Sequence, residues 1–191
     1  MKPWQLLSVL LLYPDAELVA AQNELERAAA GREPLERFLA RRRATPLREL
    51  QAAYVQTFDF DRRASLHLTY HTHGDRRQRG LELVRLKRRY AEAGQPLTSG
   101  ELPDYLPVLL EFAALAPTAG ETLLNELRVP LELVRARLHA TKSAYADVLD
   151  ALVAALPRRT RAQVEAARRL AQEGPPAELV GVEPFAAEAS A

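Results

Sequence analysis

The sequence predicts an all-α fold, arranged as a single compact domain of about ten short helices. The chain of 191 residues contains no isoleucine and only twelve valines, so the β-branched residues that strands favour are scarce. Leucine, alanine, glutamate and arginine, which favour helices, are abundant instead. Apolar residues also recur at helical spacing along most of the chain. A domain of this length can bury a core without disulfides or structural metals.

Helix start and stop signals place the first three helices. Pro3 can open a helix that Pro14 ends. Asp15 can cap a second helix that runs to about Ala30. The segment Glu33–Arg43 predicts a short amphipathic third helix.

The next stretch combines clear and ambiguous signals. Thr45–Pro46 predicts a helix start, because a capping side chain precedes a proline at the first helical position. The segment Ser65–His73 alternates like a strand, but its helical surroundings favour a helix. Asp75 and Gln78 form a candidate capping pair for a helix that ends near Gly94.

The second half of the chain predicts helices more regularly. The segment Pro103–Leu115 is apolar on nearly all sides, which indicates a buried helix. With Pro103 as the N-cap, Pro107 would be the fourth helical residue, whose N–H needs no intrahelical partner. We expect one helical domain at residues 1–173 and an irregular tail at 174–191. Further helices are expected at 119–127, 130–140, 143–156 and 160–173.

The composition excludes several classes of function. The absence of cysteine removes disulfides, zinc–thiolate sites, iron–sulfur ligation and cysteine nucleophiles. The 26 basic and 25 acidic residues give a net charge of +1, which argues against a dedicated nucleic-acid binder. The apolar run Leu6–Tyr13 is shorter than the roughly 20 residues of a membrane span and lacks a signal-peptide cleavage site. We therefore expect a cytoplasmic protein without stable membrane association.

Catalytic signatures are also missing. The eight glycines are scattered singly, so no phosphate-binding glycine loop is formed. His67 and His71 are four residues apart, a spacing that can place two metal ligands on one helix face. No HExxH pattern surrounds them, and a hydrogen-bonded polar cluster that fixes the helix end before Gly74 is the simpler interpretation.

Charge is distributed unevenly along the chain. Residues 75–90 hold seven basic and two acidic side chains, whereas residues 101–132 hold six acidic and one basic. The basic segment lacks aromatics interleaved for base stacking, so a solvated helix face explains it better than phosphate binding. The acidic segment coincides with the most apolar helix. An acidic rim around an apolar surface suits a basic, partly apolar peptide, and solvated acids on helix N-terminal turns are the alternative.

Four sequence blocks resemble one known family. They are YVQTFD at 54–59, SLHLTYHTHGD at 65–75, RG at 79–80 and ELPDYLPVLLEF at 101–112. Their order and spacing are similar to the nitrate reductase assembly chaperones, the NarJ or delta subunit family, which belongs with TorD and DmsD to the redox-enzyme maturation chaperones. The resemblance covers about residues 4–156. Tyr105 is a departure, because the family usually has a histidine there, and tyrosine cannot gain a charge near neutral pH.

The resemblance implies a non-catalytic chaperone without a cofactor or metal. Such proteins bind the N-terminal segment of the molybdenum-containing catalytic subunit of respiratory nitrate reductase. They keep the apo-subunit competent for molybdenum cofactor insertion and delay its docking to the membrane. Molybdenum cofactor biosynthesis proteins are a further class of partner. The residues expected on the client-binding surface are Tyr54, Phe58, Tyr70, His71, His73, Asp75, Glu101, Asp104, Tyr105 and Glu111.

Two other classes stay open on the sequence alone. A helical nucleotide- or nucleic-acid-binding module would use residues 76–89, and it predicts salt-sensitive retention on heparin or DNA. A metal enzyme would use the histidine cluster, and it predicts stoichiometric metal in the purified protein.

Overall fold

The computed structural model describes residues 2–74, 77–98, 100–158 and 160–173. Within these ranges the chain forms twelve α-helices and one 3-10 helix, and its only β pairing is an isolated bridge, so the predicted all-α class is confirmed. None of the described helices is both long and apolar enough to cross a membrane. The elements in order are α1 (Pro3–Leu10), α2 (Ala16–Ala20), α3 (Gln22–Ala29), α4 (Glu33–Arg43), α5 (Leu47–Phe58), η1 (Arg62–Ala64), α6 (Leu68–His73), α7 (Arg77–Glu92), α8 (Leu106–Leu115), α9 (Pro117–Glu126), α10 (Arg128–Ala140), α11 (Ala146–Ala155) and α12 (Arg161–Glu173).

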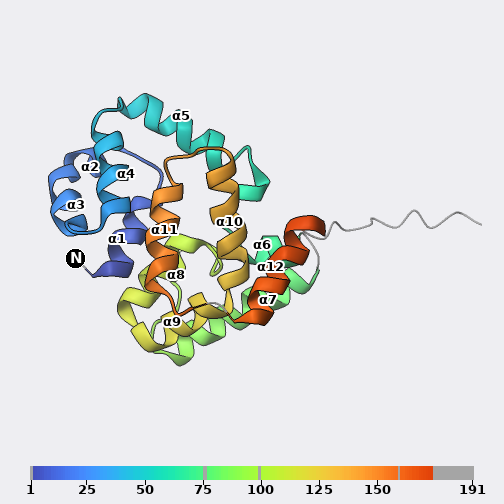
Figure 1. The fold of residues 1–191 in the computed structure, drawn as a ribbon. Helices are drawn as coiled ribbons and strands as arrows, with labels where there is room; N and C mark the ends of the chain where they lie inside the picture. The colour runs from blue at the N-terminus through green and yellow to red at the C-terminus, as the bar shows by residue number, and fades with distance from the viewer. Residues whose placement is uncertain (1, 75–76, 99, 159, 174–191) are drawn as a thin grey trace, which may run out of the picture.

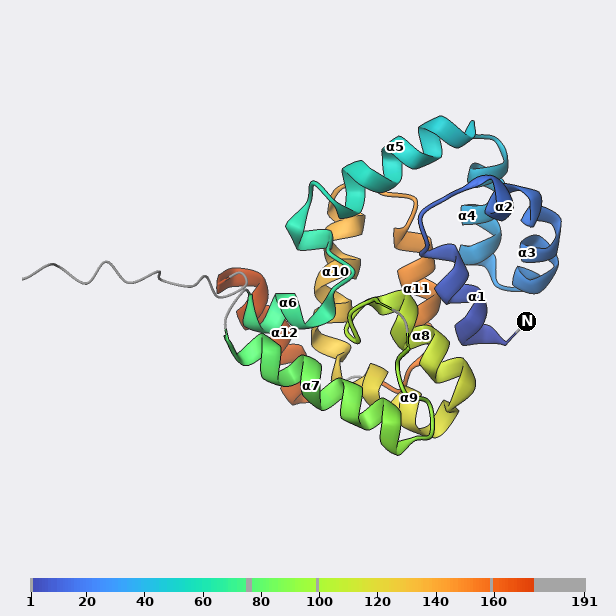
Figure 2. The ribbon, with the colours of Figure 1, turned by 180° about the vertical axis from the view of Figure 1, so that it is seen from behind.

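The helices surround α8, which lies near the centre of the molecule (Figures 1 and 2). It packs most extensively against α1 and α9, and it buries seven of its ten residues, as its apolar sequence predicts. The helices α2, α3 and α4 lie at one end, while α6, α7 and α12 lie at the other. Between them α11 packs against α4 and α10, and α10 also contacts α12. The helix α5 runs along one edge.

Prolines mark several helix starts, because the first helical N–H groups need no partner within the helix. Pro3, Pro34, Pro107 and Pro117 each occupy one of the first two positions of a helix. The predicted N-cap at Pro103 is wrong, since α8 begins at Leu106. The reason is a distant contact: the Pro103 carbonyl accepts a 2.7 Å hydrogen bond from the buried Tyr90 hydroxyl.

Two other predicted helix boundaries need correction. Asp15 caps α2 as expected, through a 2.8 Å hydrogen bond from the Leu18 N–H, but the helix expected to run to about Ala30 is interrupted at Ala21. Thr45 does not cap α5. Its hydroxyl donates to a carbonyl of the preceding helix, on Arg41, at 2.8 Å.

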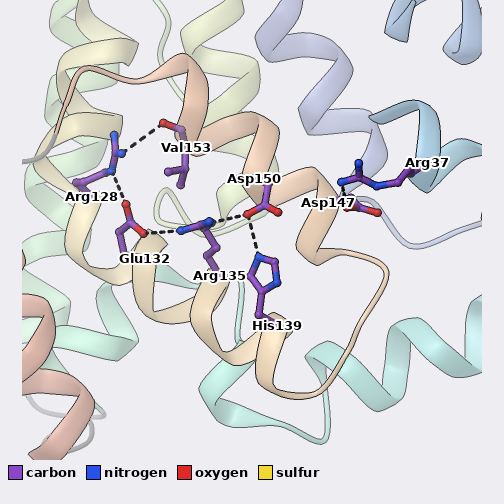
Figure 3. A network of polar contacts seen from close by, with 8 residues as sticks. All are labelled: Arg37, Arg128, Glu132, Arg135, His139, Asp147, Asp150 and Val153. Carbon is purple, nitrogen blue, oxygen red and sulfur yellow. Dashed lines mark hydrogen bonds and ion pairs between the residues drawn. The ribbon is translucent and has the colours of Figure 1, made fainter. Parts of the chain in front are cut away.

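Figure 3 shows the polar contacts that join α10 to α11. Arg128 donates to Glu132 at 3.1 Å and to the Val153 carbonyl at 3.3 Å, so it satisfies an acceptor at the end of α11. Arg135 donates to Asp150 at 2.5 Å. These contacts join α10 to α11 through the buried Arg128, which also pairs with Glu132 on its own helix, and through one partly exposed pair, Arg135–Asp150. The same figure draws the contacts His139–Asp150 and Arg37–Asp147.

Candidate functional site

The two longest sequence blocks meet at a short antiparallel bridge between His67 and Tyr105. Beside it, the Leu68 N–H donates to the Asp104 carbonyl at 3.0 Å. The helix α6 therefore begins only at Leu68. The helix expected over Ser65–His73 is right for the second half of that segment and wrong for the first half, where the strand-like alternation reflects extended backbone.

Asp104 lies at the centre of this junction and has no exposed surface. Its carboxylate accepts hydrogen bonds from the Thr69 hydroxyl at 2.5 Å and the Thr69 N–H at 3.2 Å, and it contacts His67 Nδ1 at 3.3 Å and Arg79 at 3.5 Å. Burial raises the pKa of Asp104, but the hydrogen bonds from His67 and Thr69, with the Arg79 charge, lower it overall. The carboxylate is an internal anchor, and its predicted place on the client surface is wrong.

The aromatic residues predicted for the same surface are also largely buried. Tyr54 and Phe58 project from α5 into a ring cluster with Tyr145, with ring centroids 4.8 to 5.9 Å apart. The Tyr54 hydroxyl lies 3.2 Å from that of Tyr105. Burial, with this hydrogen bond, raises the pKa of Tyr54 above its ordinary value. Tyr54 and Phe58 therefore attach α5 to the core instead of facing a ligand.

The histidines do not share a helix face. His67 lies outside α6 and contacts Asp104, whereas His71 is buried and its Nε2 lies 2.8 Å from the Ser65 carbonyl. Burial lowers the pKa of His71, so a neutral ring donates its Nε2–H to that carbonyl. Within the described ranges, no group of three or more histidine, aspartate or glutamate side chains could hold a metal ion. The contacts fit the polar-cluster interpretation.

Three predicted residues lie near the end of α6. Tyr70 and His73 are partly exposed, and His73 lines a cavity of about 440 Å³ that α6, α7, α9, α10 and α12 enclose. Gly74 ends the helix with a φ of 58°, a left-handed conformation that favours glycine. Asp75 lies outside the described residues, so its predicted capping and client-binding roles stay predictions.

The basic and acidic segments pair with each other across the helix interface. Arg85 and Arg89 on α7 both lie 3.3 Å from Glu126 on α9, and Arg79 reaches Asp104. Glu132 is buried against Arg128. The six acids of residues 101–132 therefore do not form one rim, and the pairing leaves few of the α7 arginines in the described part available for phosphates.

One exposed carboxylate remains beside apolar surface. Glu111 is the single charged residue of α8, and it faces solvent without a hydrogen bond or ion pair to any described residue. Two hollows of about 260 and 290 Å³ flank it, and both are lined by Glu111 and Leu115. Leu115 is 56% exposed. We call this surface the α8 groove; its exposed or partly exposed apolar residues are Val9, Leu12, Leu97, Val108 and Leu115, and its charged residues are Glu111 and Lys2.

Glu111 is thus the one predicted residue that lies in the α8 groove. Glu101 is exposed and lies near Tyr105. Burial raises the pKa of Tyr105, and the Glu101 charge adds to this increase. The apolar residues of the groove were missed. Their signal was available, because a lone charge in an apolar helix marks the solvent side, and Val108 and Leu115 are three and four residues from Glu111.

Comparison with known proteins gives one family, described as the nitrate reductase delta subunit, which matches residues 16–170. The probable nitrate reductase molybdenum cofactor assembly chaperone NarJ of Bacillus subtilis is 36% identical over 157 residues, which are 78% of this chain and 85% of that protein. NarJ of Escherichia coli K12 is 38% identical over 157 residues, 78% of this chain and 66% of its own length. The nitrate reductase-like protein NarX of Mycobacterium tuberculosis H37Rv is 40% identical over 155 residues, and this chain spans 23% of it.

Proposed function

We propose that this chain, which belongs to the nitrate reductase delta subunit family, is an assembly chaperone for the catalytic subunit of a respiratory nitrate reductase. The observation that carries the proposal is the family match over residues 16–170, together with relatives whose names state a role in molybdenum cofactor assembly. The family is one of chaperones and not of enzymes. The chain would act in the cytoplasm, keep the apo-subunit competent for cofactor insertion and delay its docking to the membrane, alongside the molybdenum cofactor biosynthesis proteins.

The α8 groove is the surface that suits the N-terminal segment of the client best. Its apolar side chains can bury one face of an amphipathic helix, and the unpaired Glu111 can meet a lysine, an arginine or the amino terminus of the client. Glu101 offers a second exposed carboxylate. The buried residues Tyr54, Phe58, His71 and Asp104 do not line this groove, and we propose that they act by holding the fold that presents it.

Calorimetry tests the proposal with a peptide that copies about the first 15 residues of the catalytic subunit, roughly four helical turns. We expect Glu111→Lys to weaken binding about tenfold, because it replaces an attraction with a repulsion at the groove. Leu115→Arg should weaken it as much by removing apolar contact. Glu24→Lys, the same charge change at an exposed position on α3, is the matched control.

The outcomes separate the function from the site. Absence of any binding to the peptide would contradict the chaperone proposal in its present form. Binding that neither Glu111→Lys nor Leu115→Arg affects would move the client away from the α8 groove and leave the function standing. We also propose that residues 174–191 are a tail outside the binding domain, so a chain that ends at residue 173 should bind the peptide with unchanged affinity.

A further inference from the structure

A second hollow, away from the α8 groove, lies between the end of α4, the inner side of α5 and the connection from α10 to α11. We call it the α4–α5 pocket. Its volume of about 330 Å³ is near the lower end of the range for small-molecule sites. The walls are largely apolar and include Phe38, Leu50, Ala53 and the ring of Tyr145. None of the residues that line it is acidic.

A buried arginine that makes no ion pair with any described residue lies in the wall of this pocket, although the Asp15 charge is near enough to act on it. Arg42 is only 8% exposed, and its Nη1 donates to the Gln22 amide oxygen at 2.9 Å. Its Nη2 is buried and has no hydrogen-bond partner. Removing a guanidinium from water without pairing it is costly, and native proteins usually compensate such a charge. Arg128, the other buried arginine in the described ranges, does have a carboxylate partner, Glu132.

Two further cations lie around the pocket, beside hydroxyl and amide groups that can donate or accept. Lys142 lines the pocket, and its side chain makes no hydrogen bond or ion pair with any described residue. Its backbone has a φ of 55°, a left-handed conformation that is unfavourable for lysine. Burial raises the pKa of the Tyr145 hydroxyl above its ordinary value, and the nearby Arg42 charge opposes this shift. Arg41 at the rim is held only loosely, 3.6 Å from Asp147.

We propose that the α4–α5 pocket binds a small amphiphilic carboxylate, with its anion on the unpaired side of Arg42 and its apolar part against Phe38, Leu50 and Ala53. A carboxylate matches the planar donor fork of arginine, and the apolar walls require a hydrocarbon group on the ligand. Nη2 is closed to solvent, so the carboxylate reaches it after a rotamer change of the Arg42 side chain, which long side chains make rapidly. The site is separate from the α8 groove and does not depend on the proposed chaperone function.

Two sources share this chemistry: a medium-chain fatty acid and the C-terminal residue of an apolar peptide. Calorimetry of the full chain with octanoate, and with acetyl-Leu-Phe as the free acid, tests both. The neutral probes octanamide and acetyl-Leu-Phe amide show whether the charge is needed. We expect one acid at least to bind, about tenfold or more tightly than its amide, as a charge-assisted hydrogen bond to a desolvated guanidinium requires. The acid that binds more tightly identifies the source.

Two variants assign the binding to this pocket. Arg42→Met keeps the length of the side chain and removes the charge, and Ala53→Trp fills the cavity while leaving the arginine in place. We expect each to weaken acid binding about tenfold or more, whereas Arg88→Met on the exposed side of α7 leaves it unchanged. Arg42→Met should also fold, because the loss of an unpaired buried charge offsets the loss of the hydrogen bond to the buried Gln22 amide oxygen. If Arg42→Met does not fold, Ala53→Trp alone tests whether the acid binds in the α4–α5 pocket. Failure of both acids to bind, equal affinity for acids and amides, or full binding by Ala53→Trp would overturn the proposal.

Discussion

Replacing Asp104 with alanine should destabilise the fold strongly, although the residue is charged and lies in a connection between helices. The carboxylate has no exposed surface and accepts from both the hydroxyl and the N–H of Thr69, which is itself only 3% exposed. The substitution leaves both of these buried donors without an acceptor. It also removes the charge that faces Arg79 and His67.

The magnitude follows from these partners. A buried donor left unsatisfied costs about 1–3 kcal/mol, and the loss of one member of a buried charged pair adds to that. We therefore expect the free energy of unfolding to fall by about 4 kcal/mol. For a domain of this size, this corresponds to a melting temperature lower by about 10 °C. Asp104→Asn keeps one acceptor oxygen and should lose roughly half as much.

Urea and thermal unfolding, followed by circular dichroism at neutral pH, measure this effect. Glu111→Ala provides the control, because Glu111 is exposed and unpaired among the described residues, and its removal should change stability by less than about 0.5 kcal/mol. A loss below about 1 kcal/mol for Asp104→Ala would refute the view that its carboxylate anchors the junction of the two sequence blocks. The refutation would also reopen the predicted place of Asp104 on the client surface.

Three further outcomes are expected. The pKa of Asp104 is lower in the folded than in the unfolded chain, where it is about 3.9. Its contribution to stability is therefore present above about pH 3.9 and is lost as the pH falls through the folded pKa. Asp104→Asn should show a shallower loss of stability in acid than the parent, and parallel pH profiles would contradict this. Gly120→Ala should lower the free energy of unfolding by about 1–3 kcal/mol, because the new Cβ would lie 2.3 Å from the Ala113 Cα of α8. Gly80→Ala, on the open side of α7, should raise the free energy of unfolding by about 0.5–1 kcal/mol. Urea unfolding measures both, and changes of equal sign would show that helix propensity alone determines the effect. Arg128→Met should cost about 3 kcal/mol by removing one charged partner of the buried Glu132, and adding Glu132→Leu should restore part of the loss. A double variant no better than the single one would contradict this account.

Local signals predicted those parts of the fold that local interactions decide. The helix Glu33–Arg43 was placed correctly, because acids in its first turn and arginines in its last turn complement the helix dipole. The cap at Asp15 was also correct, since it involves a residue three positions away. The start of α8 was not predicted, because the contact that keeps Pro103 out of the helix comes from Tyr90 on another element.

The candidate site was predicted less well for the same reason. Whether a carboxylate faces solvent or the core depends on partners that are distant in sequence, and for Asp104 these are Thr69, His67 and Arg79. Tyr54 and Phe58 are aromatic residues of the kind found on binding surfaces, but the ring of Tyr145 at the start of α11 packs against them. Glu111 was predicted for the client surface as part of an acidic rim; it is exposed in the structure, and its client-binding role stays a prediction.

The bridge between His67 and Tyr105 also has a consequence for how this chain can vary. It fixes the two ends of residues 69–103 beside each other, so α6, α7 and the loop that follows form a chain segment whose ends are held together. The entropy of closing such a loop grows only slowly with its length. Insertions or deletions near residues 94–98 should therefore leave α8 in place but reshape the wall of the α8 groove that Leu97 forms. Evolution can thus vary one side of the groove without moving the central helix.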